Sequence, residues 1–348
     1  DITSPGALTF SSIAANGGAA RIATSGNLAI GDGTITGALT LASANGAINS
    51  TGTITAGGAV SLNGKTGLDF NRLNSGATTS LVSASGPIRI TRLASAGLVT
   101  ANGGSIDIGS AEGLSFATVD SPGNVSITAA GDLLFNTVSA GADLALNSTG
   151  GSLTATGAVT GGYTQLASAN GITIGGDLTA GALLGIDTRG AFVANGSTYT
   201  DDASIVADGG ITMASLRSGE ITRLTASDGN ILVGNLDTSG RVSATGLDVD
   251  ISSTGSLTFD EARATSYDLR IRTGGDLNAY TLFANQDIDL AAGGTFALSG
   301  VARGFNITVT SADIDIGDEA QLGVRDSTSE IALFNGRPAQ ETFIGGAH

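Results

Sequence analysis

The amino-acid sequence predicts an all-β fold, a right-handed parallel β-helix (β-solenoid) of about sixteen coils of about 20 residues each. Three observations lead to this prediction. A large apolar residue recurs about every twenty residues along nearly the whole chain. Apolar and polar residues alternate around it, as in a β-strand with one buried face. Glycine accounts for 54 of 348 residues and aromatic residues for only 4%, which favours a core of thin aliphatic layers.

The recurring apolar positions form the first predicted element, a core ladder in which each coil supplies one anchor. Neighbouring anchors are 18 to 20 residues apart, except for two intervals of 26 residues. Because stacked strands lie about 4.8 Å apart, each anchor would rest on the anchor of the next coil. The anchors are Leu8, Leu28, Ile48, Leu68, Ile88, Leu114, Leu133, Leu153, Ile172, Phe192, Ile211, Ile231, Leu257, Leu277, Phe296 and Ile314.

The residues around each anchor predict short strands. A second apolar residue usually follows two positions later, as Phe135 follows Leu133, and the residue between them varies. This period of two predicts two or three strands per coil. A helix would need apolar residues at i, i+3, i+4 and i+7, and each glycine inside it would cost about 1 kcal/mol. A propeller would need blades of about 40 residues, and the regular aliphatic content argues against disorder.

Glycines beside the anchors predict the corners of the coils. We expect them to supply a positive φ at tight turns, helped by asparagine at Asn45, Asn63, Asn102 and Asn170. The predicted corner glycines are Gly26, Gly46, Gly86, Gly131, Gly151, Gly190, Gly229, Gly255, Gly275 and Gly294.

The repeat predicts one β-helix domain over residues 1–334, followed by a tail or the start of another segment at 335–348. The two long intervals predict six-residue insertions near residues 94–112 and 237–255. Asp250, Arg270 and Asp289 are spaced like the anchors, so they should form one column of alternating charge that keeps the coils in register. Asp69 and Arg89 should form a similar pair.

Composition excludes several classes of function. The net charge is −16, with 15 basic and 31 acidic residues and a single lysine, Lys65. We therefore expect no nucleic-acid partner and no attraction to anionic membranes. The absence of cysteine excludes disulfides, and no apolar run is long enough for a transmembrane helix. The chain begins at Asp1 without a methionine, so we expect it to be a piece of a longer or processed protein.

Few residues are of the types that form catalytic or metal-binding sites, and we expect neither an enzyme nor a bound cofactor. The only histidine is His348. Aspartates cluster at Asp248/Asp250, Asp287/Asp289 and Asp313/Asp315/Asp318, where they alternate with aliphatic residues and should face solvent. Bound calcium and a carboxylate pair of the glycosidase type are the alternatives for these clusters. The residues between the apolar columns do not form the threonine array of an ice-binding solenoid.

The units LNSTGGSLTATGAV (146–159), LASANGITIGGDL (166–178) and LTASDGNILVGNL (224–236) resemble the repeats of bacterial filamentous haemagglutinin-like exoproteins. These proteins are adhesins exported by two-partner secretion. The resemblance covers about residues 6–334 and implies a right-handed β-helical shaft. The family's secretion domain typically contains Asn-Pro motifs, and none occurs here, so the resemblance implies shaft rather than secretion domain.

The resemblance implies a non-enzymatic structural and adhesive fibre at the bacterial cell surface or in the medium. Its implied partners are an outer-membrane two-partner-secretion transporter during export, and then a host cell, matrix, glycan or second copy of the chain. Self-association would build filaments. A β-helical polysaccharide-active enzyme and the shaft of a contact-dependent toxin-delivery exoprotein are the alternatives.

Overall fold

The structure, a computed structural model, describes residues 1–324 and 330–336, which form strands and turns and no helix. The chain has two compact units, Asp1–Asn170 with Ile174–Gly176, and Gly171–Thr173 with Asp177–His348. Each is a parallel β-solenoid, and together they hold about 16 turns of roughly 20 residues. The predicted all-β solenoid is therefore confirmed, and its right-handedness stays a prediction. Of the predicted tail, only residues 335 and 336 are described, and His348 lies outside the described residues.

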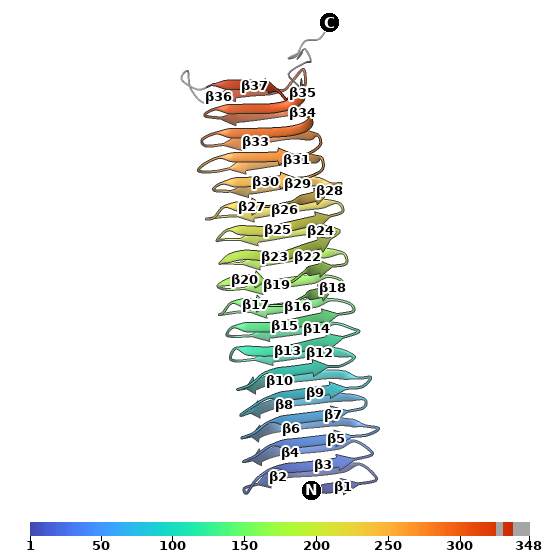
Figure 1. Cartoon of the computed structure of the whole chain (residues 1–348). Coiled ribbons are helices and arrows are strands. Elements are labelled where there is room, and N and C mark those ends of the chain that lie inside the picture. The colour runs from blue at the N-terminus through green and yellow to red at the C-terminus, as the bar shows by residue number, and fades with distance from the viewer. Residues whose placement is uncertain (325–329, 337–348) are drawn as a thin grey trace. The chain divides into compact units, whose positions relative to one another are not determined.

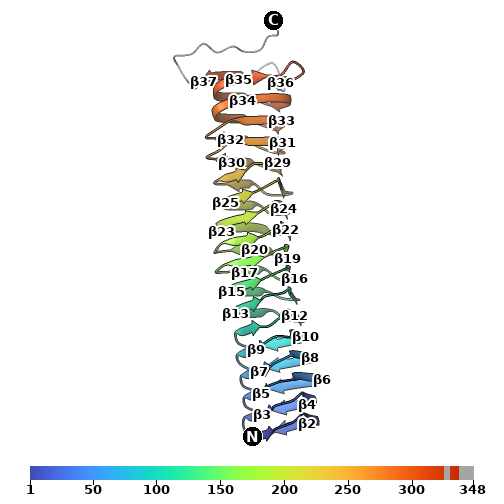
Figure 2. The same ribbon diagram turned by 90° about the vertical axis from the view of Figure 1, so that its right-hand side faces the viewer.

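Unit 1 consists of two stacks of parallel strands, which Figure 2 shows on its two sides. Stack A contains β2 (Leu8–Ala15), β4 (Leu28–Ile35), β6 (Ala47–Ala56), β8 (Gly67–Ser75), β10 (Pro87–Ser95), β12 (Ser105–Ser110), β14 (Val125–Ala129), β16 (Leu144–Ser148) and β19 (Thr164–Ser168). Stack B contains β1 (Ile2–Ser4), β3 (Ala20–Thr24), β5 (Leu39–Ser43), β7 (Val60–Gly64), β9 (Thr79–Ser83), β11 (Val99–Asn102), β13 (Leu114–Ser121), β15 (Leu133–Ala140), β17 (Leu153–Ala155) and β18 (Val159–Gly161). Strand β20 (Gly171–Ile174) contains residues of both units.

Unit 2 has the same construction, and its strands follow one another coil by coil in Figure 1. Stack C contains β21 (Leu178–Ala180), β23 (Ala191–Thr200), β25 (Ile211–Ser218), β27 (Ile231–Val233), β28 (Leu236–Thr238), β30 (Val249–Ser253), β32 (Leu269–Thr273), the first parts of β34 (Ile288–Gly304) and β35 (Ile307–Ile316), and β37 (Ile331–Asn335). Stack D contains β22 (Leu183–Thr188), β24 (Asp202–Ala207), β26 (Ile221–Ala226), β29 (Arg241–Gly246), β31 (Leu257–Ala264), β33 (Leu277–Ala284), the last parts of β34 and β35, and β36 (Gln321–Val324).

Most coils combine one long and one short strand, and both strands alternate buried and exposed side chains. Strand β15 buries Leu133, Phe135 and Val138. Two successive side chains, at 136 and 137, face solvent, so the alternation moves by one residue at this point. Leu133 lies between Leu114 and Leu153 of the neighbouring coils. The ring of Phe135 stacks on that of Phe116 at 5.0 Å between centroids. Full burial of each such side chain contributes about 1.5–3 kcal/mol, so the solenoid gains stability evenly along its length.

The predicted anchors are buried, but they form several ladders rather than one. Fifteen of them are at most 3% exposed, and Leu8 in the first complete coil is half-buried. Ile172 is buried in β20. The register joins Leu8, Leu28, Ile48, Leu68 and Ile88 in stack A; Leu114, Leu133 and Leu153 in stack B; Phe192, Ile211 and Ile231 in stack C; and Leu257, Leu277, Phe296 and Ile314 in stack D.

The ladders break because the chain twice places two short strands in succession. After the long strand β10, stack A continues with the short strand β12, and Ile88 pairs with Ile106. Stack B meanwhile passes from the short strand β11 to the long strand β13. In unit 2, Ile231 pairs with Val249 of the short strand β30, and the long strand β31 follows β29 in stack D.

The structure accounts for the six extra residues predicted near 94–112 and 237–255. The extra residues do not lengthen a turn. They complete an additional short strand, which advances the chain by half a coil and moves the later long strands to the other stack of the same unit. Spacing alone could not distinguish a longer loop from an added strand.

The conformation expected at the corner glycines was also wrong. Among the described residues a positive φ occurs only at Gly18, Gly67 and Gly171, and the four asparagines before glycine do not adopt it. Nine of the ten predicted glycines directly precede or lie within two residues of the next strand, and Gly294 lies inside β34. Eight of the ten, all except Gly190 and Gly255, have no room for a Cβ: at Gly86, for example, it would overlap the carbonyl oxygen of Thr66 in the coil before. At Gly255 a Cβ would meet nothing closer than 3.9 Å.

Buried serines and threonines complete the corners. Ser148 is fully buried, its Oγ donates to the carbonyl oxygen of Gly131 at 2.7 Å, and it accepts the N–H of Gly151 at 3.1 Å. Ser43 makes the equivalent bonds to Gly26 and Gly46. These hydroxyls satisfy backbone groups that the turn leaves without a partner in its own coil.

Candidate functional site

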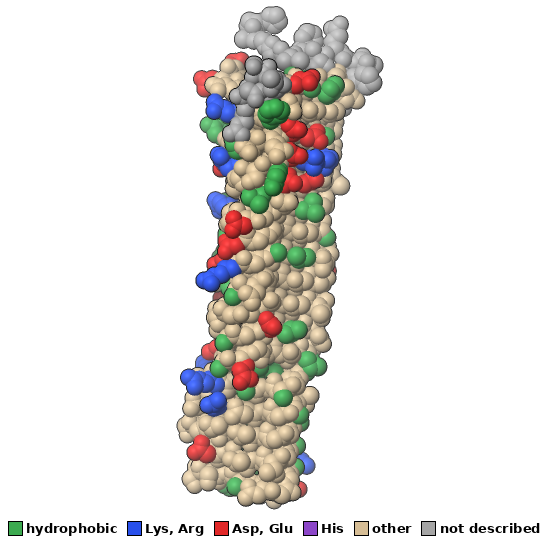
Figure 3. All heavy atoms as spheres, turned by 90° about the vertical axis from the view of Figure 1, so that its left-hand side faces the viewer, with side chains coloured by type: hydrophobic (Ala, Val, Ile, Leu, Met, Phe, Trp, Pro, Cys, Tyr) green, Lys and Arg blue, Asp and Glu red, His purple; other side chains and the backbone are tan. Residues whose placement is uncertain are grey.

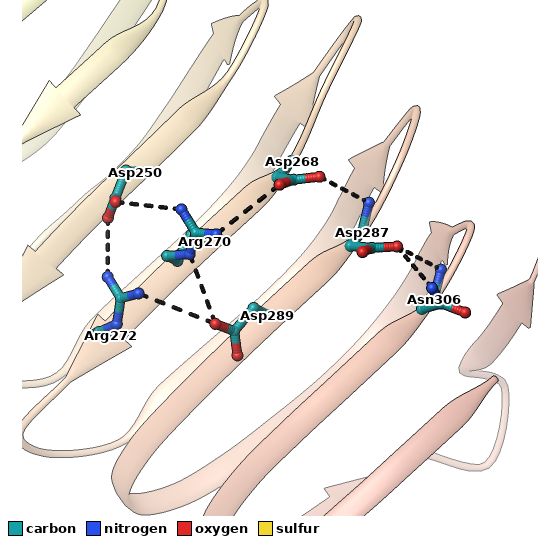
Figure 4. Close-up of polar contacts among 7 residues, drawn as sticks. All are labelled: Asp250, Asp268, Arg270, Arg272, Asp287, Asp289 and Asn306. Atoms are coloured by element: carbon teal, nitrogen blue, oxygen red, sulfur yellow. Dashed lines mark hydrogen bonds and ion pairs between the residues drawn. The ribbon is translucent and has the colours of Figure 1, made fainter. Parts of the chain in front are cut away.

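Charged side chains gather on one surface of unit 2, near the C-terminal end of its described coils (Figure 3). Residues 171–348 carry 23 acidic and ten basic residues, whereas residues 1–170 carry eight and five. The densest group, here called the Arg270 cluster, lies on the coils that contain β30, β32, β34 and β35. It consists of Asp250, Asp268, Arg270, Arg272, Asp287, Asp289 and Asn306 (Figure 4).

Arg270 is the centre of this cluster. The register places it between Asp250 and Asp289, as the sequence predicted. Its guanidinium nitrogens lie 3.7 Å from Asp250, 3.9 Å from Asp268 and 3.6 Å from Asp289. Arg272 joins the same two strands, 3.2 Å from Asp250 and 4.0 Å from Asp289. These side chains are 30–48% exposed, so each pair contributes at most about 1 kcal/mol. The second predicted pair, Asp69 and Arg89, also lies side by side in the register.

A ladder of Asp and Asn side chains runs along the corner next to the cluster. Asp268 Oδ1 accepts the backbone N–H of Asp287 at 3.1 Å, and Asp287 Oδ1 accepts that of Asn306 at 3.2 Å. Asn306 Oδ1 in turn accepts the N–H of Glu330 at 3.0 Å. The same bond occurs elsewhere, for example from Ser152 to Asp132 at 2.7 Å. Sequence reasoning missed this ladder, although an Asp or Asn directly before the first buried residue of a strand was its signal, as in Asp268-Leu269 and Asp132-Leu133.

Asp248 occupies the ladder position in the coil before Asp268. Its carboxylate accepts the backbone N–H of Asp268, and its Oδ1 is buried without a hydrogen-bond partner. Burial, and then the neighbouring Asp268 carboxylate, raise the pKa of Asp248 above its ordinary value of 3.8, while Arg270 opposes the shift. Asp248 therefore carries its charge at a cost in the folded chain.

The predicted aspartate groups do not assemble a metal site in the described part of the chain. No three acidic or histidine side chains come together there as ligands. Asp248, Asp250, Asp287 and Asp289 lie near Arg270 or on the corner ladder, as described above. Asp313, Asp315 and Asp318 are exposed, and Asp313 Oδ1 accepts the N–H of Ile314 at 2.9 Å. The described residues also include no helix that could span a membrane.

Three open grooves in unit 2 were not predicted. The Arg270 groove, of about 570 Å³, lies beside the cluster and includes Glu330 and Phe334. The Tyr199 groove, of about 500 Å³, includes Asp201, Arg217, Asp237 and Ser239. The Tyr280 groove, of about 380 Å³, includes Arg241, Thr258, Asp260, Asn278 and Ser299. Sequence reasoning missed them because it places a residue on the outer surface without showing which outer residues of adjacent coils meet.

No family model, curated protein or solved structure matches the chain.

Proposed function

We propose that the chain is a segment of a non-enzymatic, shaft-like structural and adhesive protein of a bacterial surface. The observation that carries the proposal is the uniform construction of both units. In each, strands stay in parallel register from coil to coil, and short corners join them. Such a stack resists bending because every coil is hydrogen-bonded to its neighbours, and its outer side chains are free to vary.

The proposed route to the surface is export through an outer-membrane transporter of the two-partner type. Two features support it. The chain has no cysteine, and each coil contacts only its neighbours, so folding can proceed coil by coil as the chain emerges. A gene for such a transporter beside the gene for this chain would support the route, and secretion that persists after deletion of that transporter would contradict it.

The adhesive part of the proposal is tested with the purified chain fixed to beads. We expect these beads to attach to host cells, to extracellular matrix or to one another, and bare beads to stay dispersed. The proposal is wrong if the coated beads bind none of these surfaces, the free chain does not self-associate, and the chain instead cleaves a polysaccharide.

One observation favours a second candidate, a polysaccharide-active enzyme. The Arg270 groove brings Asp287, Asp289 and Glu330 together with Arg270 and the 54% exposed Phe334. Carboxylates beside an aromatic platform are typical of enzymes that cleave glycosidic bonds. The hydrogen bonds of Asp287 and the ion pairs of Asp289 favour a structural role. Release of reducing sugars by the chain, abolished by Asp289→Asn or Glu330→Gln, would establish this candidate instead.

A further inference from the structure

Two grooves of unit 2, defined above by Tyr199 and Tyr280, are lined by different residues of the same types. Each contains an exposed tyrosine, Tyr199 at 43% or Tyr280 at 61% exposure. Each also contains an arginine that forms an ion pair with an aspartate of the adjacent coil. In the Tyr199 groove, Tyr199 pairs in the register with Arg217, and Arg217 with Asp237. In the Tyr280 groove, Arg241 Nη1 donates to Asp260 Oδ1 at 2.9 Å. The chain has only four tyrosines, so two grooves with the same composition point to a shared ligand chemistry.

The ring of Tyr280 packs against the next coil of the solenoid. In the Tyr280 groove, a Cβ at Gly300 of the next coil would lie 2.9 Å from Cδ2 of Tyr280, so the ring packs closely over a bare backbone. The arginine and aspartate belong to strands with fixed register, and their ion pair limits their motion further. A ligand would therefore meet a largely pre-organised surface, which lowers the entropic cost of binding.

The chemistry of these grooves matches a sugar ring. An aromatic face offers an apolar platform for the C–H face of a pyranose, while a carboxylate accepts hydrogen bonds from hydroxyls and a guanidinium donates to them. Asn278, Thr258 and Ser299 add neutral polar groups at the Tyr280 groove. The grooves are open and rich in charge, which does not suit a small apolar ligand.

The charge of unit 2 restricts the class of sugar. With 23 acidic and ten basic residues, residues 171–348 repel sulfated or uronic-acid polymers. Each guanidinium in the two grooves is already paired with a carboxylate, so neither offers a free cation to an anionic group. A neutral polysaccharide carries no such penalty.

We propose that unit 2 binds neutral polysaccharides through the Tyr199 and Tyr280 grooves. Each groove is shallow and binds weakly alone, and a polymer that engages many copies of the chain gains avidity. This inference deepens the proposed adhesive function by naming the class of surface, and it rests on that function only for its biological meaning.

The test is affinity gel electrophoresis of the whole chain in gels containing dextran, hydroxyethyl cellulose or glycogen, with heparin as a polyanionic probe. The decisive variant is Tyr199→Ala/Tyr280→Ala. The matched control is Tyr163→Ala, because Tyr163 is 59% exposed but lies in unit 1, where the described residues form no ion pair. A denaturation midpoint equal to that of the parent chain shows that each variant is folded.

We expect at least one neutral polysaccharide to retard the parent chain and Tyr163→Ala, and the double variant to bind about tenfold more weakly or not at all. Heparin should retard none of them. The inference is overturned if no neutral polysaccharide retards the chain, if only heparin does, or if the folded double variant binds like the parent. If the gels contradict the site but beads coated with the chain still attach to cells, the proposed adhesive function stands without this site.

Discussion

Single residues at the corners show that close packing between coils, more than turn conformation, selects glycine. Neither Gly86 nor Gly229 is among the glycines with a positive φ, yet a Cβ at either would overlap a backbone carbonyl of the preceding coil. Gly255 occupies the same sequence position in its coil and has open space. Glycines at the same place before the anchor therefore differ greatly in whether they can be replaced by a larger residue.

Replacing Gly86 by alanine should destabilise unit 1 by about 1–3 kcal/mol, because the added methyl group forces two coils apart. Urea denaturation followed by circular dichroism measures the change. Gly255→Ala is the matched control, and its midpoint should stay within error of the parent chain. Equal effects of the two substitutions would show that packing does not explain the corner glycines.

The charged carboxylate of Asp248 lowers the stability of the folded chain. Its raised pKa means that the folded chain binds this proton more tightly than the unfolded chain does. Stability from this group is thus present below the ordinary value of 3.8 and is lost as the pH rises through the folded pKa. An asparagine would keep the oxygen that accepts the N–H of Asp268 and remove the charge.

Asp248→Asn should therefore raise the urea midpoint at about pH 7, and the gain should vanish near pH 3, where Asp248 is protonated. Denaturation at the two pH values measures this difference. Asp143→Asn, at an exposed aspartate, serves as the control and should change neither midpoint. A gain of equal size at both pH values would contradict the role of ionisation.

At the scale of the element, long and short strands are interchangeable within a stack. Both present alternating buried side chains at the same coil spacing, so Ile88 of the long strand β10 packs on Ile106 of the short strand β12 as well as on Leu68 of the long strand β8. The solenoid therefore accepts an added short strand without a bulging loop.

Deleting residues 104–109 should restore the alternation of long and short strands and place β13 beside β10. The chain has no cysteine, so introduced pairs can report the register. In the full chain, Arg89 pairs with Asp107, and Arg89→Cys/Asp107→Cys should form a disulfide. In the deletion variant, Arg89→Cys/Ser115→Cys should cross-link instead.

Mass spectrometry of the oxidised proteins measures both cross-links. The Arg89→Cys/Ser115→Cys pair in the full-length chain is the control and should stay reduced. If the deletion variant unfolds, or folds without this new cross-link, the half-coil explanation is wrong.

The sequence was sufficient to predict the strands, the buried anchors and the charge column around Arg270, because each follows from local alternation and a constant period. It was insufficient for the stack that each strand joins, since β12 and a long loop give the same interval between Ile88 and Leu114. The grooves around Tyr199 and Tyr280 depend on which outer residues of successive coils are adjacent, and a half-coil shift changes those neighbours.

At the scale of the whole molecule, the chain is strongly acidic. The chain carries a net charge of −16, and its isoelectric point is about 4.2. We expect self-repulsion to oppose non-specific association between copies at neutral pH.

Light scattering should rise sharply as the pH approaches about 4.2 and fall again on return to neutral pH, because repulsion between copies disappears at that pH. Circular dichroism recorded in parallel should show that the strands persist, which separates association from unfolding. Scattering that stays flat through this range would mean that net charge does not keep the copies apart.

The added half coil also affects what insertions and deletions in the gene would do to the protein surface. A gain or loss of six codons at such a place keeps the reading frame and the apolar pattern, yet it turns the outer residues of every later coil in that unit toward the opposite side. Any partner that binds one side of the unit would then meet different side chains on the same type of scaffold. Short in-frame duplications between similar repeats would thus change which side chains the unit presents on each side and leave the type of fold unchanged.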